Sequence, residues 1–175
     1  MKVRLFAVAA VLMLLSFATE AQNLKIGYIN AEKVLSEWPK AQSAQTELSE
    51  YETQLQTRLQ AKVKDFQTKV ADYNAKIETM DDLTKKEKET ELQNLQTQIQ
   101  QFEADASESI SKKNRTLFEP LQVELKQTID AVSKENGFTH VFNQNAALVF
   151  TSDTAGDISD LVAQKLGYTL STSSN

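Results

Sequence analysis

Cysteine is absent from this 175-residue chain, and glycine and proline are scarce, with four and two residues. Without cysteine no disulfide can form and no lipid can be attached to an N-terminal cysteine, so stability must come from packing and assembly. No glycine stands between Gly27 and Gly137, and the two prolines are Pro39 and Pro120. Glycine and proline cost a helix interior about 1 and about 3 kcal/mol relative to alanine. The stretch between the two glycines is therefore predicted to be helical almost throughout.

Groups that could carry catalysis or bind a metal are also sparse. His140 is the single histidine, and no spaced carboxylates accompany it, so we interpret it as a structural or surface residue. Asp81 and Asp82 lack the glycine turn and the spaced oxygens of a calcium loop. The glycines match no phosphate-binding loop. We expect no enzyme activity, no metal and no cofactor.

The charge balance argues against nucleic acid as a partner. The formal net charge is −5, and it becomes −6 without residues 1–21, which hold two basic residues and one acidic residue. Non-specific binding to a duplex depends on Lys and Arg that neutralise phosphates. The same deficit weakens the case for anionic lipid.

The first 21 residues have the pattern of a secretory signal peptide. Lys2 and Arg4 precede an apolar run from Leu5 to Leu15, and small residues lead to a cleavage site predicted after Ala21. The run is shorter than the roughly 20 residues of a membrane-spanning helix. We expect export and removal of this segment.

Both ends of the remaining chain predict short strands. Residues 24–29 alternate apolar and polar with period two, and Asn30 can cap a short helix at 31–35. Near the other end, Gly137 is placed to end a helix in the left-handed conformation. Residues 138–143 and 147–151 then predict two strands joined by a tight turn at Gln144–Asn145, and Asp157 can cap a helix at 158–166.

Between these ends, apolar residues recur in steps of three and four along two segments. A mean step near 3.5 is typical of a coiled coil, and consecutive steps of four at Leu55–Val63 indicate a stutter. From Pro39, at a first helical turn, to Met80 the helix would span roughly 60 Å. The stripes comprise Ala44, Leu48, Tyr51, Leu55, Leu59, Val63, Phe66, Val70, Tyr73, Ile77 and Met80, then Leu92, Leu95, Ile99, Phe102, Ala106, Ile110, Leu117, Leu121, Leu125 and Val132.

The two segments are predicted to form an antiparallel hairpin with its tip near residues 79–84. Thr84 and Glu87 fit a capping box that would begin the second helix. Pro120 removes one backbone hydrogen bond and is expected to kink that helix near Thr116, where the hairpin meets the strands. Most stripe residues would only join the two helices. The apolar residues best placed to contact a partner are Leu59, Val63, Tyr73, Met80 and Leu83.

These elements give an α+β, mostly α, fold with five parts. Residues 1–21 are the signal peptide, 22–38 and 120–170 form a small β body, 39–119 form the helical arm, and 171–175 are predicted to be a disordered tail. So small a sheet leaves exposed edges, which favours a homo-oligomer closed through the strand body.

The order of the motifs resembles the Skp (OmpH) family of periplasmic chaperones for outer-membrane proteins over roughly residues 24–167. The resemblance depends most on the closing run, residues 138–143, 145–150 and 157–162. It is supported by residues 26–30 leading into 32–35, by 39–41 at the start of the arm, and by 59–64 within it.

The resemblance implies a homotrimer whose strands form a central barrel and whose three arms enclose unfolded outer-membrane β-barrel proteins without ATP. It implies a periplasmic location. The implied interface comprises Ile26, Tyr28, Val141, Phe142, Leu148, Val149 and Phe150. Family members often carry strongly basic arms, whereas this chain is acidic, so contact with membrane or lipopolysaccharide stays open. A structural or adaptor protein of the cell envelope, with the hairpins as spacers or docking rods, is the alternative.

Overall fold

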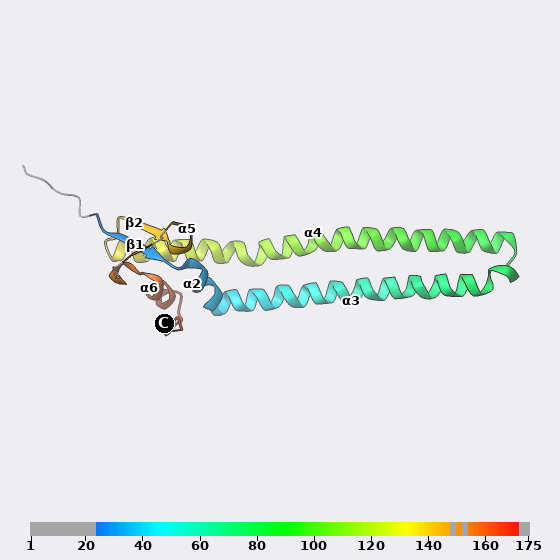
Figure 1. Cartoon of the computed structure of the whole chain (residues 1–175), viewed down its shortest axis with the longest axis horizontal. Coiled ribbons are helices and arrows are strands. Elements are labelled where there is room, and N and C mark those ends of the chain that lie inside the picture. The colour runs from blue at the N-terminus through cyan, green and yellow to red at the C-terminus, as the bar shows by residue number, and fades with distance from the viewer. Residues whose placement is uncertain (1–23, 148–149, 152–153, 172–175) are drawn as a thin grey trace, which may run out of the picture.

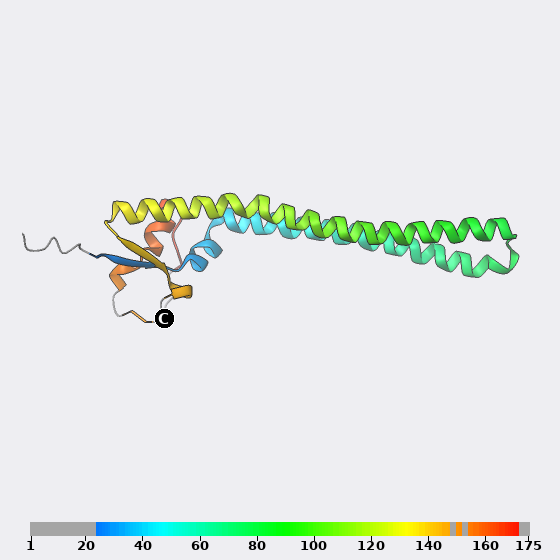
Figure 2. The same ribbon diagram turned by 90° about the horizontal axis from the view of Figure 1, so that it is seen from above.

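The computed structural model describes residues 24–147, 150–151 and 154–171, which form a small body and one long helical arm (Figure 1). The N-terminal and C-terminal segments of the chain lie together in the body, while the arm extends away from it (Figure 2). The signal peptide predicted for residues 1–21 lies outside the described residues. No described helix is both long and apolar enough to cross a membrane.

The body is built on two parallel strands, β1 (Ile26–Ile29) and β2 (His140–Asn143), paired in the register Ile26 to His140. Parallel strands need a long crossover connection, and here the entire arm is that connection. On the other side of β1, Tyr28 forms an isolated parallel bridge with Asp157. The residues just before the last helix therefore lie alongside β1, on the side away from β2.

The predicted hairpin of two C-terminal strands is wrong in the described residues. Its turn is replaced by helix α5 (Gln144–Ala147), and neither Phe150 nor Thr151 lies in a strand. Two alanines favour helix at the end of α5, and the Asn145 amide donates to the Glu32 carboxylate at 2.8 Å. The remainder of the predicted strand, Leu148 and Val149, lies outside the described residues.

Helix α2 (Ala31–Glu37) begins as predicted, because the Asn30 side chain accepts a hydrogen bond from the Lys33 amide at 2.9 Å. Trp38 follows in an extended conformation and Pro39 opens α3 (Pro39–Lys76). Trp38 is 1% exposed, so the residue that redirects the chain into the arm is also anchored in the core.

The arm reverses where the sequence predicts, through the 3-10 turn η2 (Ile77–Thr79) into α4 (Asp82–Glu135). The predicted capping box at Thr84 is wrong. Asp81 is the N-cap, and its carboxylate accepts from the Thr84 amide at 2.9 Å and from the Thr84 hydroxyl at 2.8 Å. Aspartate caps helices at least as well as threonine, so the helix begins at the earlier residue.

Helix α4 continues through Pro120 without a break, and its axis changes direction only gently where the arm meets the body (Figure 2). It ends at the predicted left-handed glycine: Gly137 has φ 71°, and the Phe138 amide donates to the Ser133 carbonyl at 2.9 Å. Positive φ is costly for residues with a Cβ atom, so Gly137 allows the chain to turn directly into β2.

The core lies between β1, α2, the C-terminal part of α4 and the last helix, α6 (Ser159–Lys165). Its largest fully buried side chains are Val34, Trp38, Ile158 and Val162. Gly27 is required for close packing, because a Cβ atom there would lie 2.8 Å from Cδ1 of Phe138.

The last helix is one residue shorter at each end than predicted. The Asp157 carboxylate accepts from the Ser159 amide at 2.9 Å, and Gly167 follows the helix with φ 90°. Leu170 is buried, and Ser171 donates two hydrogen bonds of 2.6 Å to the Glu37 carboxylate. Ser171 is thus attached to the body, contrary to the predicted tail, and residues 172–175 lie outside the described part.

Candidate interaction surfaces

The seam between the two arm helices changes along its length. We call residues 39–55 and 106–121 the arm base, and residues 56–105 the distal arm. In the arm base Ala41, Ala44, Leu48, Leu55 and Leu121 are buried. No described residue of the distal arm is buried. Its stripe residues, including Leu59, Phe66, Leu92 and Ile99, are only half-buried, as expected where each helix has one neighbour.

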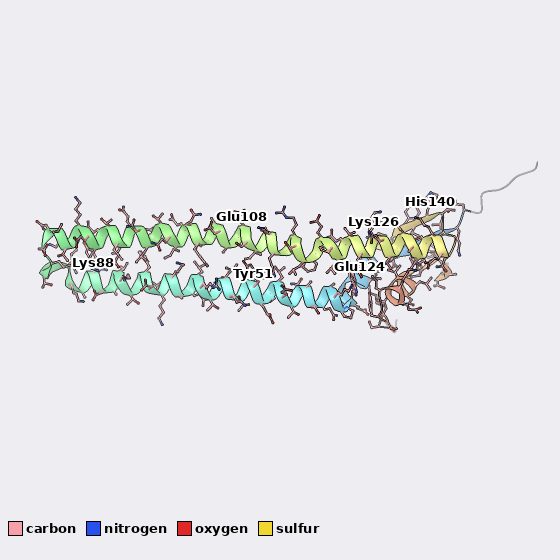
Figure 3. All side chains as sticks on the ribbon, turned by 180° about the vertical axis from the view of Figure 1, so that it is seen from behind. Tyr51, Lys88, Glu108, Glu124, Lys126 and His140 are labelled. Atoms are coloured by element: carbon pink, nitrogen blue, oxygen red, sulfur yellow. The ribbon has the colours of Figure 1, made fainter. Side chains whose placement is uncertain are left out.

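Polar contacts join the two helices of the distal arm close to its tip. Between the helices, the Lys69 ammonium donates to Glu91 Oε1 at 2.6 Å and the Tyr73 hydroxyl donates to Glu89 at 2.7 Å. Within α4, Lys88 donates to Glu91 Oε2 at 2.8 Å. We call these five residues the polar clasp. Figure 3 shows Lys88 near the tip, far from Glu124 at the body end.

The charges of the polar clasp stabilise one another. The hydrogen bond from Lys69, followed by that from Lys88, lowers the pKa of Glu91 to about 2. The same contact raises the pKa of Lys69. The hydrogen bond to Glu89 raises the pKa of Tyr73. Glu91 is the centre of the clasp, because both of its oxygens accept from a lysine.

The five arm residues predicted to contact a partner do not form one patch. Leu59, Val63, Tyr73 and Met80 are half-buried, and Tyr73 is already bonded in the polar clasp. Leu59 borders a shallow groove shared with Leu55, Ala106 and Ile110. Leu83, at the tip, is 69% exposed.

The residues predicted as an interface in the body differ widely in exposure. Ile26, Phe142 and Phe150 are 51%, 41% and 82% exposed. Tyr28 is buried and Val141 is half-buried, so these two residues contribute mainly to packing within the chain. Leu148 and Val149 lie outside the described residues.

Three exposed apolar residues were not among the predicted contact residues. Leu161, on α6, is 39% exposed. Leu24 is 62% exposed beside β1, and Val123 is 50% exposed on α4 next to Pro120. The exposure of Val123 could have been predicted from the sequence, because this apolar residue lies outside the stripe that contains Leu121 and Leu125.

No convergent chemical site is visible in the part of the chain that the structure describes. His140 is exposed, lies 3.2 Å from the Thr139 hydroxyl and stacks on Phe142. Among the described residues, no three His, Asp or Glu side chains are grouped closely enough to hold a metal ion.

Comparison with known proteins identifies a family and related folds among solved structures. A family described as outer membrane protein (OmpH-like) matches residues 25–166. The fold is similar to the crystal structure of a protein assigned as an OmpH-like outer membrane chaperone from Caulobacter crescentus CB15. The two share 15% identity and a TM-score of 0.73, over 81% of this chain and 82% of the other. No curated protein matches this chain.

Proposed function

The chain belongs to the OmpH-like (Skp) family, and from this membership we propose that it is a periplasmic chaperone for outer-membrane proteins. It acts as a holdase: it binds unfolded β-barrel precursors without ATP and delays their aggregation. The observation that carries the proposal is the family match across both body and arm, residues 25–166. Similarity restricted to a heptad pattern would not distinguish this family from other coiled coils.

The physics of such clients suits an extended polar arm. A β-barrel precursor alternates apolar and polar residues and exposes unpaired strand edges, so it aggregates in water. The half-buried distal seam offers many weak apolar contacts along its length, and three arms together would add avidity without any single tight contact. We propose no catalytic step, and we propose that residues 1–21 direct export and are then removed.

We further propose that the working unit is a homotrimer assembled through the body. Ile26, Phe142 and Phe150 are large apolar residues left exposed in a single chain, and a two-stranded sheet is marginal by itself. Phe142→Asp is expected to yield monomers in sedimentation experiments. The matched control is Val123→Asp, which places the same charge at an equally exposed apolar residue outside the predicted interface. If Phe142→Asp remains a trimer and Val123→Asp becomes a monomer, the trimer interface lies on α4 and the proposal is wrong.

The holdase proposal is tested by diluting a urea-denatured outer-membrane β-barrel into buffer with and without the mature chain. We expect suppressed light scattering and a soluble complex of one client with one trimer. Deletion of residues 76–88 is expected to keep the trimer and weaken holding. Unchanged scattering with a well-folded trimer would contradict the proposal.

The second candidate is an adaptor that uses the arm as a docking rod. The exposed Leu83 at the tip favours this function, because a docking rod needs a residue at its end that can bind the partner. An adaptor would bind one folded envelope protein, lose that binding with Leu83→Ser, and leave the scattering of an unfolded barrel unchanged.

A further inference from the structure

The two halves of the arm are held together by different forces. In the arm base the Lys113–Glu47 ion pair, at 2.5 Å, flanks a seam in which Ala44, Leu48 and Leu121 are buried. At the body end of this seam, Lys40 of the arm base pairs with Glu124, just beyond it, at 2.7 Å. In the distal arm the polar clasp accompanies a seam with no buried residue among those described. Ion pairs of the same kind therefore lie over buried apolar residues in the arm base, but over half-buried residues in the distal arm.

We propose that the polar clasp is a salt-sensitive latch, and that its release lets α3 and α4 separate in the distal arm while the arm base stays closed. Exposed ion pairs contribute little each, and salt screens them. In the distal arm the apolar packing between α3 and α4 is weak, so even a small contribution from the ion pairs can decide whether the two helices stay together. Glu91 is the residue on which the latch depends, because it joins α3 through Lys69 and orients Lys88 of its own helix.

The charged groups around Glu91 support this assignment. From α3 it faces Lys69, whose own field includes the carboxylate of Asp65. From α4 it contacts Lys88. Tyr73, on α3 one turn beyond Lys69, bonds instead to Glu89. Loss of the Glu91 charge would remove the described ion pairs of both lysines and leave Lys69 only the weaker field of Asp65. The Tyr73 contact would remain as the last interhelical hydrogen bond before the tip.

Release of the latch would change what the distal arm presents. Full separation of the helices also breaks the Tyr73–Glu89 hydrogen bond, so it would free the Tyr73 ring and expose more of the half-buried stripe residues beside the clasp, Phe66, Val70, Leu92 and Leu95. The inference is independent of the proposed function, because it concerns the protein without any client.

The test is amide hydrogen exchange on the full mature chain at neutral pH. Glu91→Gln removes one charge and keeps the shape, and we expect exchange in residues 64–97 to become about two- to fivefold faster, because an exposed ion pair makes only a small contribution to local stability. The first control is Glu108→Gln, which makes the same change on the same helix. Glu108 is exposed, forms no described ion pair, and points away from α3 (Figure 3). Its exchange should match the wild type.

A second control removes an ion pair in the arm base, where the seam between the helices is buried. Glu47→Gln removes the partner of Lys113 and should leave exchange in the arm base unchanged. Raising the salt concentration to about 1 M, where screening acts within about 3 Å, should accelerate distal exchange in the wild type and have no further effect in Glu91→Gln.

Distances give a direct readout, because the chain has no native cysteine. Spin labels at Gln67→Cys and Gln93→Cys, both exposed residues of the distal arm, should show a broader and longer distance distribution in high salt. For labels at Gln45→Cys and Arg115→Cys in the arm base, the distance distribution should not change with salt. The latch is refuted if Glu91→Gln exchanges like Glu108→Gln, or if both label pairs respond to salt equally.

Discussion

The body and the distal arm are stabilised in different ways: the body by a buried core, and the distal arm by a half-buried seam and polar contacts. In the body, Val34, Trp38, Ile158 and Val162 are fully buried between segments distant in sequence. In the distal arm, each helix has one neighbour, the stripe is half-solvated, and Lys69 and Glu91 join the helices at 2.6 Å. This chain extends its distal arm without a buried core, so we expect the stability of the arm to decrease with distance from the body.

The largest effect is expected where the body redirects the chain into the arm. Trp38→Ala should lower the free energy of unfolding by about 3–5 kcal/mol, the usual cost of removing a large buried aromatic side chain. Urea denaturation followed by helical circular dichroism measures it. A loss below about 1 kcal/mol would contradict the role of Trp38 as the anchor, and Tyr51→Ala, on the half-buried surface of α3, is the control with a smaller expected loss.

A close approach within the body gives the next effect. Gly27→Ala should cost about 1–3 kcal/mol, as overpacking usually does, because the new methyl group would lie 2.8 Å from Cδ1 of Phe138. The double variant with Phe138→Leu should recover part of this loss. If the two substitutions were simply additive, the contact would not be the cause.

The boundary between arm base and distal arm can be located with two leucines one turn apart. Leu55→Ala removes the last buried residue of α3 and should cost about 2–3 kcal/mol, whereas Leu59→Ala, at a half-buried position, should cost about 1 kcal/mol. Native-state hydrogen exchange measures both. Equal losses would mean that the seam does not weaken at this point.

The smallest effects come from titration, and they act on the two regions at opposite ends of the pH scale. In the distal arm, the pKa of Glu91 is lowered from 4.5 to about 2. Its contribution to stability is therefore complete above pH 4.5 and is lost as the pH falls towards 2. Exchange in residues 64–97, corrected for intrinsic rates, should rise over this window in the wild type and stay flat in Glu91→Gln.

In the body, burial raises the pKa of Tyr168 from 10.0 to about 12, with a smaller effect of Glu37. The unfolded chain loses its proton first, so stability is intact below pH 10 and falls as the pH rises towards 12. Tyr168 also donates to the Val34 carbonyl. Alkaline unfolding of the body should shift to higher pH in Tyr168→Phe, and an unchanged transition would show that another group controls it.

The sequence by itself determined the local structure, because local structure depends on neighbouring residues. The absence of glycine between Gly27 and Gly137 and the 3.5-residue stripe correctly predict α3 and α4, and Asn30 and Gly137 act as the predicted caps. The predicted cap at Thr84 was wrong, because Asp81, three residues earlier, caps the helix, and both residue types favour this position.

Only the tertiary structure decided which distant segments meet. The expected turn at Gln144–Asn145 was chosen as the nearest pairing in sequence, but β2 pairs in parallel with β1 across the whole arm. Likewise, Tyr73 fitted a partner-facing role by its position in the stripe, and its bond to Glu89 depends on the register of the hairpin. Pairing across more than a hundred residues is set by the packing of Trp38, Ile158 and Val162 in one core, which no local pattern encodes.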